Sequence, residues 1–352
     1  MHEPHTDGRG KPQPLGFRPN LFVMSLIVIA VMTAFVFSGL LFTGDRCDLM
    51  GCGDNWTYLG PHAFFMDASI HSGDFPLWNP LILCGKPFAA NPQAAAFYPP
   101  NLIRSLAVVR PEPIDTHISL IVMTLLHLLM GAAATLALAR RHGLSHAASL
   151  AAAAVFLLNA NVVGRFLLHW NIVCMAAWLP VILLLVRHAV TAQSIRAALG
   201  PMALAGIAFG FSALIGFVQI TFYMGVAVAG YAVLCGWLMG RGPTEERGPR
   251  RMVAGLGVAA AVGAVAVAVS AAMWLPAAEL ARLNVRANDA RASYELEPEL
   301  GHPPLDTAEY LVAYPGAEHL MSLHGPGTVA VLLAVAGLVY GRRREALAFG
   351  LL

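Results

Sequence analysis

Long apolar runs without any charged residue are the feature that most constrains this chain. The first, residues 21–42, is 22 residues long, enough for a helix that crosses the ~30 Å hydrocarbon core of a membrane. It is longer than the core of a signal peptide, and no A-x-A cleavage site follows it, so we expect it to remain as a first span. Similar runs follow at about 117–138, 145–163, 170–186, 199–215, 219–239, 252–275 and 326–341. We therefore predict an all-α polytopic membrane protein, a transmembrane helix bundle of about eight spans.

The overall composition agrees with this fold class. Residues of the AVILMFWYC class make up 57% of the 352 residues, and charged residues only 12%, about half of the ~25% typical of soluble proteins. A composition of this kind excludes a soluble enzyme with a normal solvated surface, a disordered chain and a nucleic-acid binder.

The placement of Lys and Arg predicts the orientation in the membrane. If the N-terminus is cytoplasmic, 14 of the 22 Lys and Arg lie in the cytoplasmic segments, as the positive-inside rule requires. All 22 basic and 20 acidic residues fall outside the expected spans, whereas a wrong register would bury several charges at ~2.5–3.5 kcal/mol each. The cytoplasmic segments are 1–20, 139–144, 187–198, 240–251 and the residues from 342 onward.

Two outer loops, 43–116 and 276–325, are too long to be simple connections. The outer side holds 15 of the 20 acidic residues. We divide the chain into a cytoplasmic tail (1–20), a membrane domain (21–341) and a cytoplasmic turn (342–352). The last residues of that turn read as the start of a ninth span, as expected for part of a longer protein.

The first outer loop is predicted to contain short helices. Apolar residues recur at spacings of three and four, on one face of a helix: Trp56, Leu59, Ala63, Met66 and Ile70. An apolar face of this kind suits a helix that lies in the membrane interface.

Prolines indicate where helices are excluded and where they begin in the rest of this loop. Residues 75–80 cannot be helical, because each proline disfavours helix at the residue before it. Asn91 followed by Pro92 reads as a helix cap and a first-turn proline, and Pro100 is expected to begin another short helix that runs to Val109. We expect these helices to pack against the spans and to leave an outward-facing cavity near Asp54.

Residues 53–102 contain a specific combination of motifs: Gly73, Pro-Leu-Trp-Asn-Pro at 76–80, Gly-Lys-Pro at 85–87, Gln93 and Phe-Tyr-Pro at 97–99. With these motifs the segment resembles YfhO-like bacterial membrane proteins, which belong to the GT-C class of integral membrane glycosyltransferases. A weaker similarity lies at 274–280, and the remainder of the chain agrees only in topology.

The resemblance implies a chemistry. GT-C enzymes transfer a sugar from a polyprenyl-phosphate donor to an acceptor at the outer face, generally with inversion, and an acidic residue just after the first span acts as general base. This role falls on Asp54, the acid of the Gly53-Asp54 pair. The family usually has Gln four residues later, where this chain has Tyr58. YfhO-like members are associated with glycosylation of cell-envelope polymers such as teichoic acids, which places the protein in the bacterial cytoplasmic membrane.

The reaction needs a base near the acceptor hydroxyl and a cation near the leaving phosphate. Asp67 is the reserve candidate for the base. Candidate substrate-binding residues are Tyr58, Trp78, Asn79, Lys86, Gln93, Tyr98, Arg104, Arg165, His169 and Gln219.

Each candidate also has a structural interpretation. Basic residues at span ends often serve as snorkelling anchors, and Trp is common at this depth without a ligand. His62 and His71 could bind a divalent metal together with an aspartate. They are nine residues apart, which matches no compact metal-binding motif, so surface histidines are the favoured interpretation and the metal stays an alternative without support. Three cysteines lie on the outer side and leave the disulfide pairing open: Cys47, Cys52 and Cys84.

Two other function classes remain open, a flippase for lipid-linked saccharides and a non-catalytic membrane scaffold. Transporters usually place ionisable residues or broken helices within the membrane. Here the expected spans carry no formal charge; His127 is the main titratable exception, and Pro180 is the main candidate for a break in a helix. This pattern favours chemistry at the outer face. Membrane lipid, a lipid-linked sugar and a cell-envelope polymer are the partners that the resemblance implies.

The predicted orientation can be tested by cysteine labelling. In a variant without the native cysteines, a membrane-impermeant reagent added to intact cells should label a cysteine at position 300 but not one at position 245, because the two positions lie on opposite sides. The reverse pattern would overturn the topology.

Overall fold

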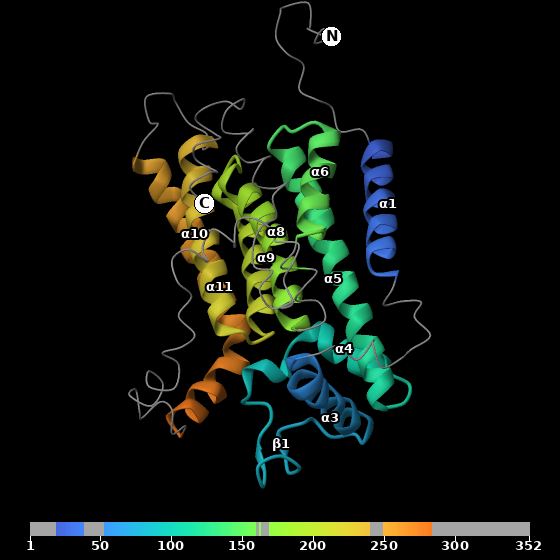
Figure 1. Cartoon of the computed structure of the whole chain (residues 1–352). Helices are drawn as coiled ribbons and strands as arrows, with labels where there is room; N and C mark the ends of the chain where they lie inside the picture. Colours follow the sequence, from blue (N-terminus) through green and yellow to red (C-terminus); the bar gives the residue numbers. More distant parts are fainter. Residues whose placement is uncertain (1–18, 39–52, 160–161, 163–168, 240–248, 284–352) are drawn as a thin grey trace, which may run out of the picture.

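A computed structural model of the chain describes residues 19–38, 53–159, 162, 169–239 and 249–283 (Figure 1). In this part of the chain five helices are long and apolar enough to cross a membrane. They are α5 (Pro113–Arg141), α8 (Trp170–Val190), α9 (Ile195–Ala213), α10 (Val218–Met239) and α11 (Pro249–Arg282). The predicted all-α polytopic fold is thereby confirmed.

The other expected spans have different outcomes. The first is the apolar helix α1 (Pro19–Val36), and the segment expected at 145–163 contains the helix α6 (His146–Leu157). Its 12 residues rise only ~18 Å, less than the ~30 Å of a membrane core. The helix is shorter than expected because Leu158 and Asn159 leave the helical conformation. The span expected at 326–341, the second outer loop from residue 284 onward and residues 342–352 lie outside the described residues.

Successive helices run in alternating directions, so their connections gather at two ends of the bundle (Figure 1). The arginine end carries Arg140 and Arg141 at the close of α5, Arg187 near the close of α8 and Arg196 at the start of α9. The loop end carries residues 53–112. α8 continues through Pro180 and is not broken there.

Small residues allow two of the spans to approach closely. Gly206 and Gly210 of α9 face Val265 and Val269 of α11, and a Cβ atom at Gly206 would lie 2.4 Å from the Cβ atom of Val265. Close packing of this kind replaces the hydrophobic driving force that helices lack in lipid. α9 and α11 therefore form a tight pair beside α8 and α10.

Residues 53–112 fold into short elements at the loop end. A π-helix, η2 (Asn55–Leu59), leads directly into α3 (Gly60–His71), which confirms the helix expected over this segment. Two short strands, β1 (Trp78–Asn79) and β2 (Lys86–Pro87), pair antiparallel. A 3-10 helix, η3 (Pro92–Ala94), and the helix α4 (Pro99–Ala107) follow, close to the expected positions.

The apolar face of η2 and α3 packs against other parts of the protein. Leu59, Ala63 and Met66 are buried, with Tyr98, Phe88 and residues of the spans as neighbours. Trp56 is the exception and is half exposed. The predicted packing of this helix against the spans is thus confirmed, with α4 and α5 among its neighbours, and its location in the membrane interface stays a prediction.

A buried ion pair joins three elements at the loop end. Arg104 of α4 donates to both carboxylate oxygens of Asp67 on α3, at 2.7 and 2.9 Å. Asp67 also accepts a hydrogen bond from Thr116 of α5 at 2.6 Å. Arg104 donates further to Asn101 and to Ser119, so that the buried charges are well satisfied.

A close approach of two backbones fixes the loop against the spans. Gly216, between α9 and α10, has a φ of +90°, and a Cβ atom there would lie 1.9 Å from the carbonyl oxygen of Pro92. Only glycine accommodates both the backbone conformation and the contact. η3 therefore rests directly on the α9–α10 connection.

Removing one member of the ion pair should destabilise the protein strongly. Asp67→Asn leaves Arg104 buried without a counter-charge, at an expected cost of ~3–5 kcal/mol. The measurement is thermal unfolding of the purified protein in detergent. The exposed Asp74→Asn is the matched control and should change stability by less than ~0.5 kcal/mol. Equal unfolding temperatures for the two variants would contradict the structural role, and the double variant Asp67→Leu/Arg104→Met should recover part of the loss.

The Gly216 contact predicts a contrast between two glycine substitutions. Gly216→Ala should cost ~1–3 kcal/mol because it strains the backbone and displaces Pro92. Gly200→Ala, in α9 with open space around it, should instead be neutral or stabilise by up to ~1 kcal/mol. Limited proteolysis of residues 77–95 provides a second readout, and unchanged cleavage in Gly216→Ala would argue against the docking of η3.

Candidate active site

Asp54 stands where the chain enters the loop-end helices. It occupies the N-cap position of the π-helix η2, and Gly53 before it has a φ of +59°, a conformation that glycine adopts readily. The side chain of Asp54 is 54% exposed. π-Helical turns are rare and occur frequently at functional sites.

An imidazole from another part of the chain meets this carboxylate. Nε2 of His169, just before α8, lies 3.0 Å from a carboxylate oxygen of Asp54. The next residue, Asn55, is buried and accepts a hydrogen bond from the backbone N–H of Trp170 at 3.1 Å. These two contacts between neighbouring residues fix the first turn of η2 against the start of α8.

One helical turn further along, Tyr58 adds a hydroxyl and a nearby cation. The phenol oxygen accepts a hydrogen bond from the side-chain amide of Asn91 at 2.9 Å. The ammonium group of Lys86 lies 5.7 Å from the centre of the Tyr58 ring, within the range of a cation–π contact. Burial raises the pKa of Tyr58, and the carboxylate of Asp54 adds to the effect, so the phenol stays protonated at neutral pH.

His62 lies one helical turn beyond Tyr58 and is buried beneath it. Its Nδ1 donates to the backbone carbonyl of Tyr58 at 2.7 Å, and its ring stacks against Phe88. Burial lowers the pKa of His62, and the charge of Lys86 lowers it further. The imidazole is therefore neutral at physiological pH, and it is 2% exposed.

Asp54, Tyr58, Lys86 and His169 thus come together from three parts of the sequence, and we call these four residues the polar cluster. A half-exposed carboxylate held by an imidazole can accept a proton from a hydroxyl group. A neighbouring ammonium group can stabilise negative charge on a phosphate. A small pocket of about 210 Å³ opens beside η2 between Trp56 and His117, although Asp54 does not line it.

Two of the predicted site residues have a different role. Asp67 and Arg104 form the buried ion pair, and their side chains are 0% and 3% exposed. Both oxygens of Asp67 are already engaged. The geometry therefore argues against Asp67 as the base and against Arg104 as a free phosphate ligand.

The remaining predicted residues are not members of the polar cluster, although Asn79 is the strand partner of Lys86. Trp78 is half exposed and packs over Gly85, where a Cβ atom would lie 2.6 Å from the indole ring. Asn79 is buried and accepts a hydrogen bond from the backbone of Leu81. Gln219, on the exposed surface of α10, donates to the hydroxyl of Tyr223. Gln93 is half-buried in η3, and Arg165 lies outside the described residues, as do Cys47 and Cys52.

A hydrogen-bonded chain around Tyr98 was not predicted. Tyr98 is fully buried; its hydroxyl donates to Nε2 of His127 on α5 and accepts from the indole N–H of Trp178 on α8 at 2.9 Å. Nδ1 of His127 donates to the carbonyl of Met123. Tyr98 was predicted to bind substrate, but here its hydroxyl is buried and engaged within the protein. The other signal in the sequence was His127, a titratable residue inside an apolar run, which needs a polar partner from elsewhere.

No protein-family model matches the chain, and comparisons with curated proteins and with solved structures found no match. In the part of the chain that the structure describes, no three His, Cys, Asp or Glu side chains are grouped as metal ligands.

Proposed function

We propose that the protein is a membrane glycosyltransferase that moves a sugar from a polyprenyl-phosphate donor to a cell-envelope acceptor at the outer face, with Asp54 as general base. The observation that supports this proposal is the contact of Asp54 with His169 at 3.0 Å, made by a carboxylate that is 54% exposed at the loop end. The resemblance of residues 53–102 to YfhO-like proteins is independent support, because it assigns the base to the same residue.

The proposed step is a single inverting displacement. An acceptor hydroxyl group gives its proton to Asp54, and its oxygen forms a bond to the anomeric carbon of the sugar. The bond between that carbon and the phosphate oxygen breaks, and the phosphate leaves with the bonding electrons. An inverting displacement of this kind needs one base rather than two carboxylates ~5–5.5 Å apart, as in a retaining glycosidase.

The other residues of the polar cluster have supporting roles in this proposal. The N–H group of His169 holds one oxygen of Asp54 and leaves the other oxygen to face the acceptor. Lys86 stabilises the charge that develops on the leaving phosphate. Tyr58, whose hydroxyl stays protonated, donates to the acceptor or donor in place of the Gln that the family usually carries.

The test is a comparison of two aspartate variants in membranes that carry the full-length protein. Asp54→Asn should insert and bind a polyprenyl-phosphate sugar as before, yet lose transfer by ~10²–10⁴-fold, the usual cost of removing a general base. Asp74→Asn, an exposed loop aspartate, is the control and should retain transfer. The assay follows movement of a radiolabelled sugar from the lipid-linked donor.

Two outcomes would contradict the proposal. Near-normal transfer by Asp54→Asn would exclude this residue as the base. Absence of transfer by the unmodified protein, combined with movement of the lipid-linked saccharide across the bilayer that survives in Asp54→Asn, would favour a flippase instead.

A further inference from the structure

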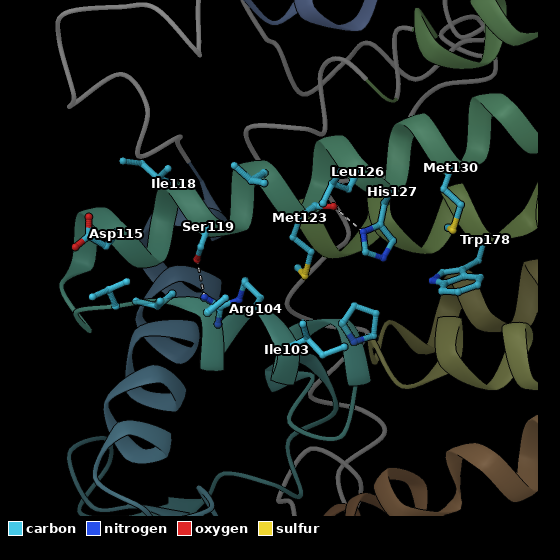
Figure 2. A pocket seen from close by; sticks show the side chains of 15 residues that line it. Ile103, Arg104, Asp115, Ile118, Ser119, Met123, Leu126, His127, Met130 and Trp178 are labelled. Atoms are coloured by element: carbon cyan, nitrogen blue, oxygen red, sulfur yellow. Dashed lines mark hydrogen bonds between the residues drawn. The ribbon is translucent and has the colours of Figure 1, made fainter. Parts of the chain in front are cut away.

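A second cavity of about 770 Å³ lies between α4, α5 and α8, away from the polar cluster (Figure 2). None of the four residues of that cluster lines it. Its lining runs along α5 from Asp115 to Met130, and Figure 2 shows these side chains arranged lengthwise between the helices. At ~1.5 Å per residue this stretch of α5 is ~22 Å long. The cavity is therefore an elongated groove, and its length suits an extended hydrocarbon chain.

The groove belongs to the surface that meets lipid. Ile118, Val122 and Leu126 follow one another at spacings of four along its α5 wall and are 40%, 47% and 60% exposed. α5 is one of the helices long and apolar enough to cross a membrane. Exposed apolar side chains on such a helix are covered by the hydrocarbon part of the bilayer.

The deep end of the groove offers no polar group for a headgroup to bind. His127 and Trp178 line it there, but their ring nitrogens already bond to Tyr98 and to the carbonyl of Met123. A polar ligand would gain nothing at this depth, since those hydrogen bonds are already made. Only an apolar chain fits this part of the groove.

The loop end of the groove carries the charge that selects a headgroup. Arg104 lines this end, but its charge is neutralised by Asp67. Asp115, in the first turn of α5, also lines it and forms no ion pair with any of the described residues. The mouth of the groove is thus net negative, which favours an ammonium group and disfavours an anionic headgroup.

We propose that this groove binds one acyl chain of a membrane glycerophospholipid with an amine headgroup, whose ammonium group pairs with Asp115. This site does not depend on the proposed glycosyltransferase activity. A polyprenyl phosphate is the poorer occupant, because its phosphate would meet the carboxylate of Asp115 without a free cation on the groove wall.

The test uses phosphatidylethanolamine with a photoreactive diazirine at the end of one chain, in vesicles that contain the full chain. Illumination and mass spectrometry should locate crosslinks on α5 near Leu126 and Met130. Val122→Trp, which fills the groove from a half-exposed position, should remove them. The matched control is Val267→Trp, at an exposed position of α11, which should leave them unchanged.

Two further variants keep the test decisive. Ala107→Trp blocks the groove from the α4 wall, so loss of crosslinks in both blocking variants, with unaltered unfolding temperatures, cannot result from a local folding defect in α5. Asp115→Asn should lower the preference for phosphatidylethanolamine over phosphatidylglycerol by about twofold to fivefold, the range of one exposed ion pair.

Several results would overturn the proposal. Crosslinks that persist in both blocking variants, or that never form on α5, would exclude a chain in the groove. Equal or stronger labelling by a phosphatidylglycerol or polyprenyl-phosphate probe would exclude the amine headgroup. Crosslinks from a photoreactive residue at position 122 to another segment of the protein, in place of lipid, would show that the chain itself fills the groove.

Discussion

The ion pair between Arg104 and Asp67 is the interaction on which the rest of the loop end depends. Burying two charges is costly, and their attraction compensates only when the remaining hydrogen-bonding groups are also satisfied. Here Thr116, Asn101 and Ser119 supply those partners. Because the three helices α3, α4 and α5 each contribute to the network, none of them can shift without leaving a buried charge unpaired.

The ion-pair network helps to hold the residues of the polar cluster in position. Asp54 and Asp67 belong to one continuous helical segment, η2 followed by α3. One end of the segment is held by Asn55 against the start of α8, and the other by Asp67 against α4 and α5. The half-exposed carboxylate of Asp54 therefore meets His169 on a segment that is fixed at both ends, which is the preorganisation that the proposed general base would require.

The same helices separate two chemically different environments. η2 and β2 carry Tyr58 and Lys86 on one side, whereas α4, α5 and α8 enclose an apolar groove with Asp115 at its mouth. Arg104 lies between the two and is neutral in effect because of Asp67. The charged substrate and the lipid chain of the two proposals would therefore use different groups of the protein.

The sequence by itself determined the membrane fold and most of the local structure. Charged residues cannot lie in lipid, so their absence from long runs located α5, α8, α9, α10 and α11, and a spacing of three and four located α3. Only the tertiary structure decided what the polar residues do. From the sequence, Asp67 and Arg104 were both candidates for the active site, but in the structure they form an ion pair between residues 37 positions apart. The contact between Asp54 and His169 joins residues 115 positions apart. The apolar face of α3 was likewise evident from the sequence, but the residues that it packs against were not. Local patterns report what each segment must bury, whereas the partner of a buried charge is set by contacts between distant segments.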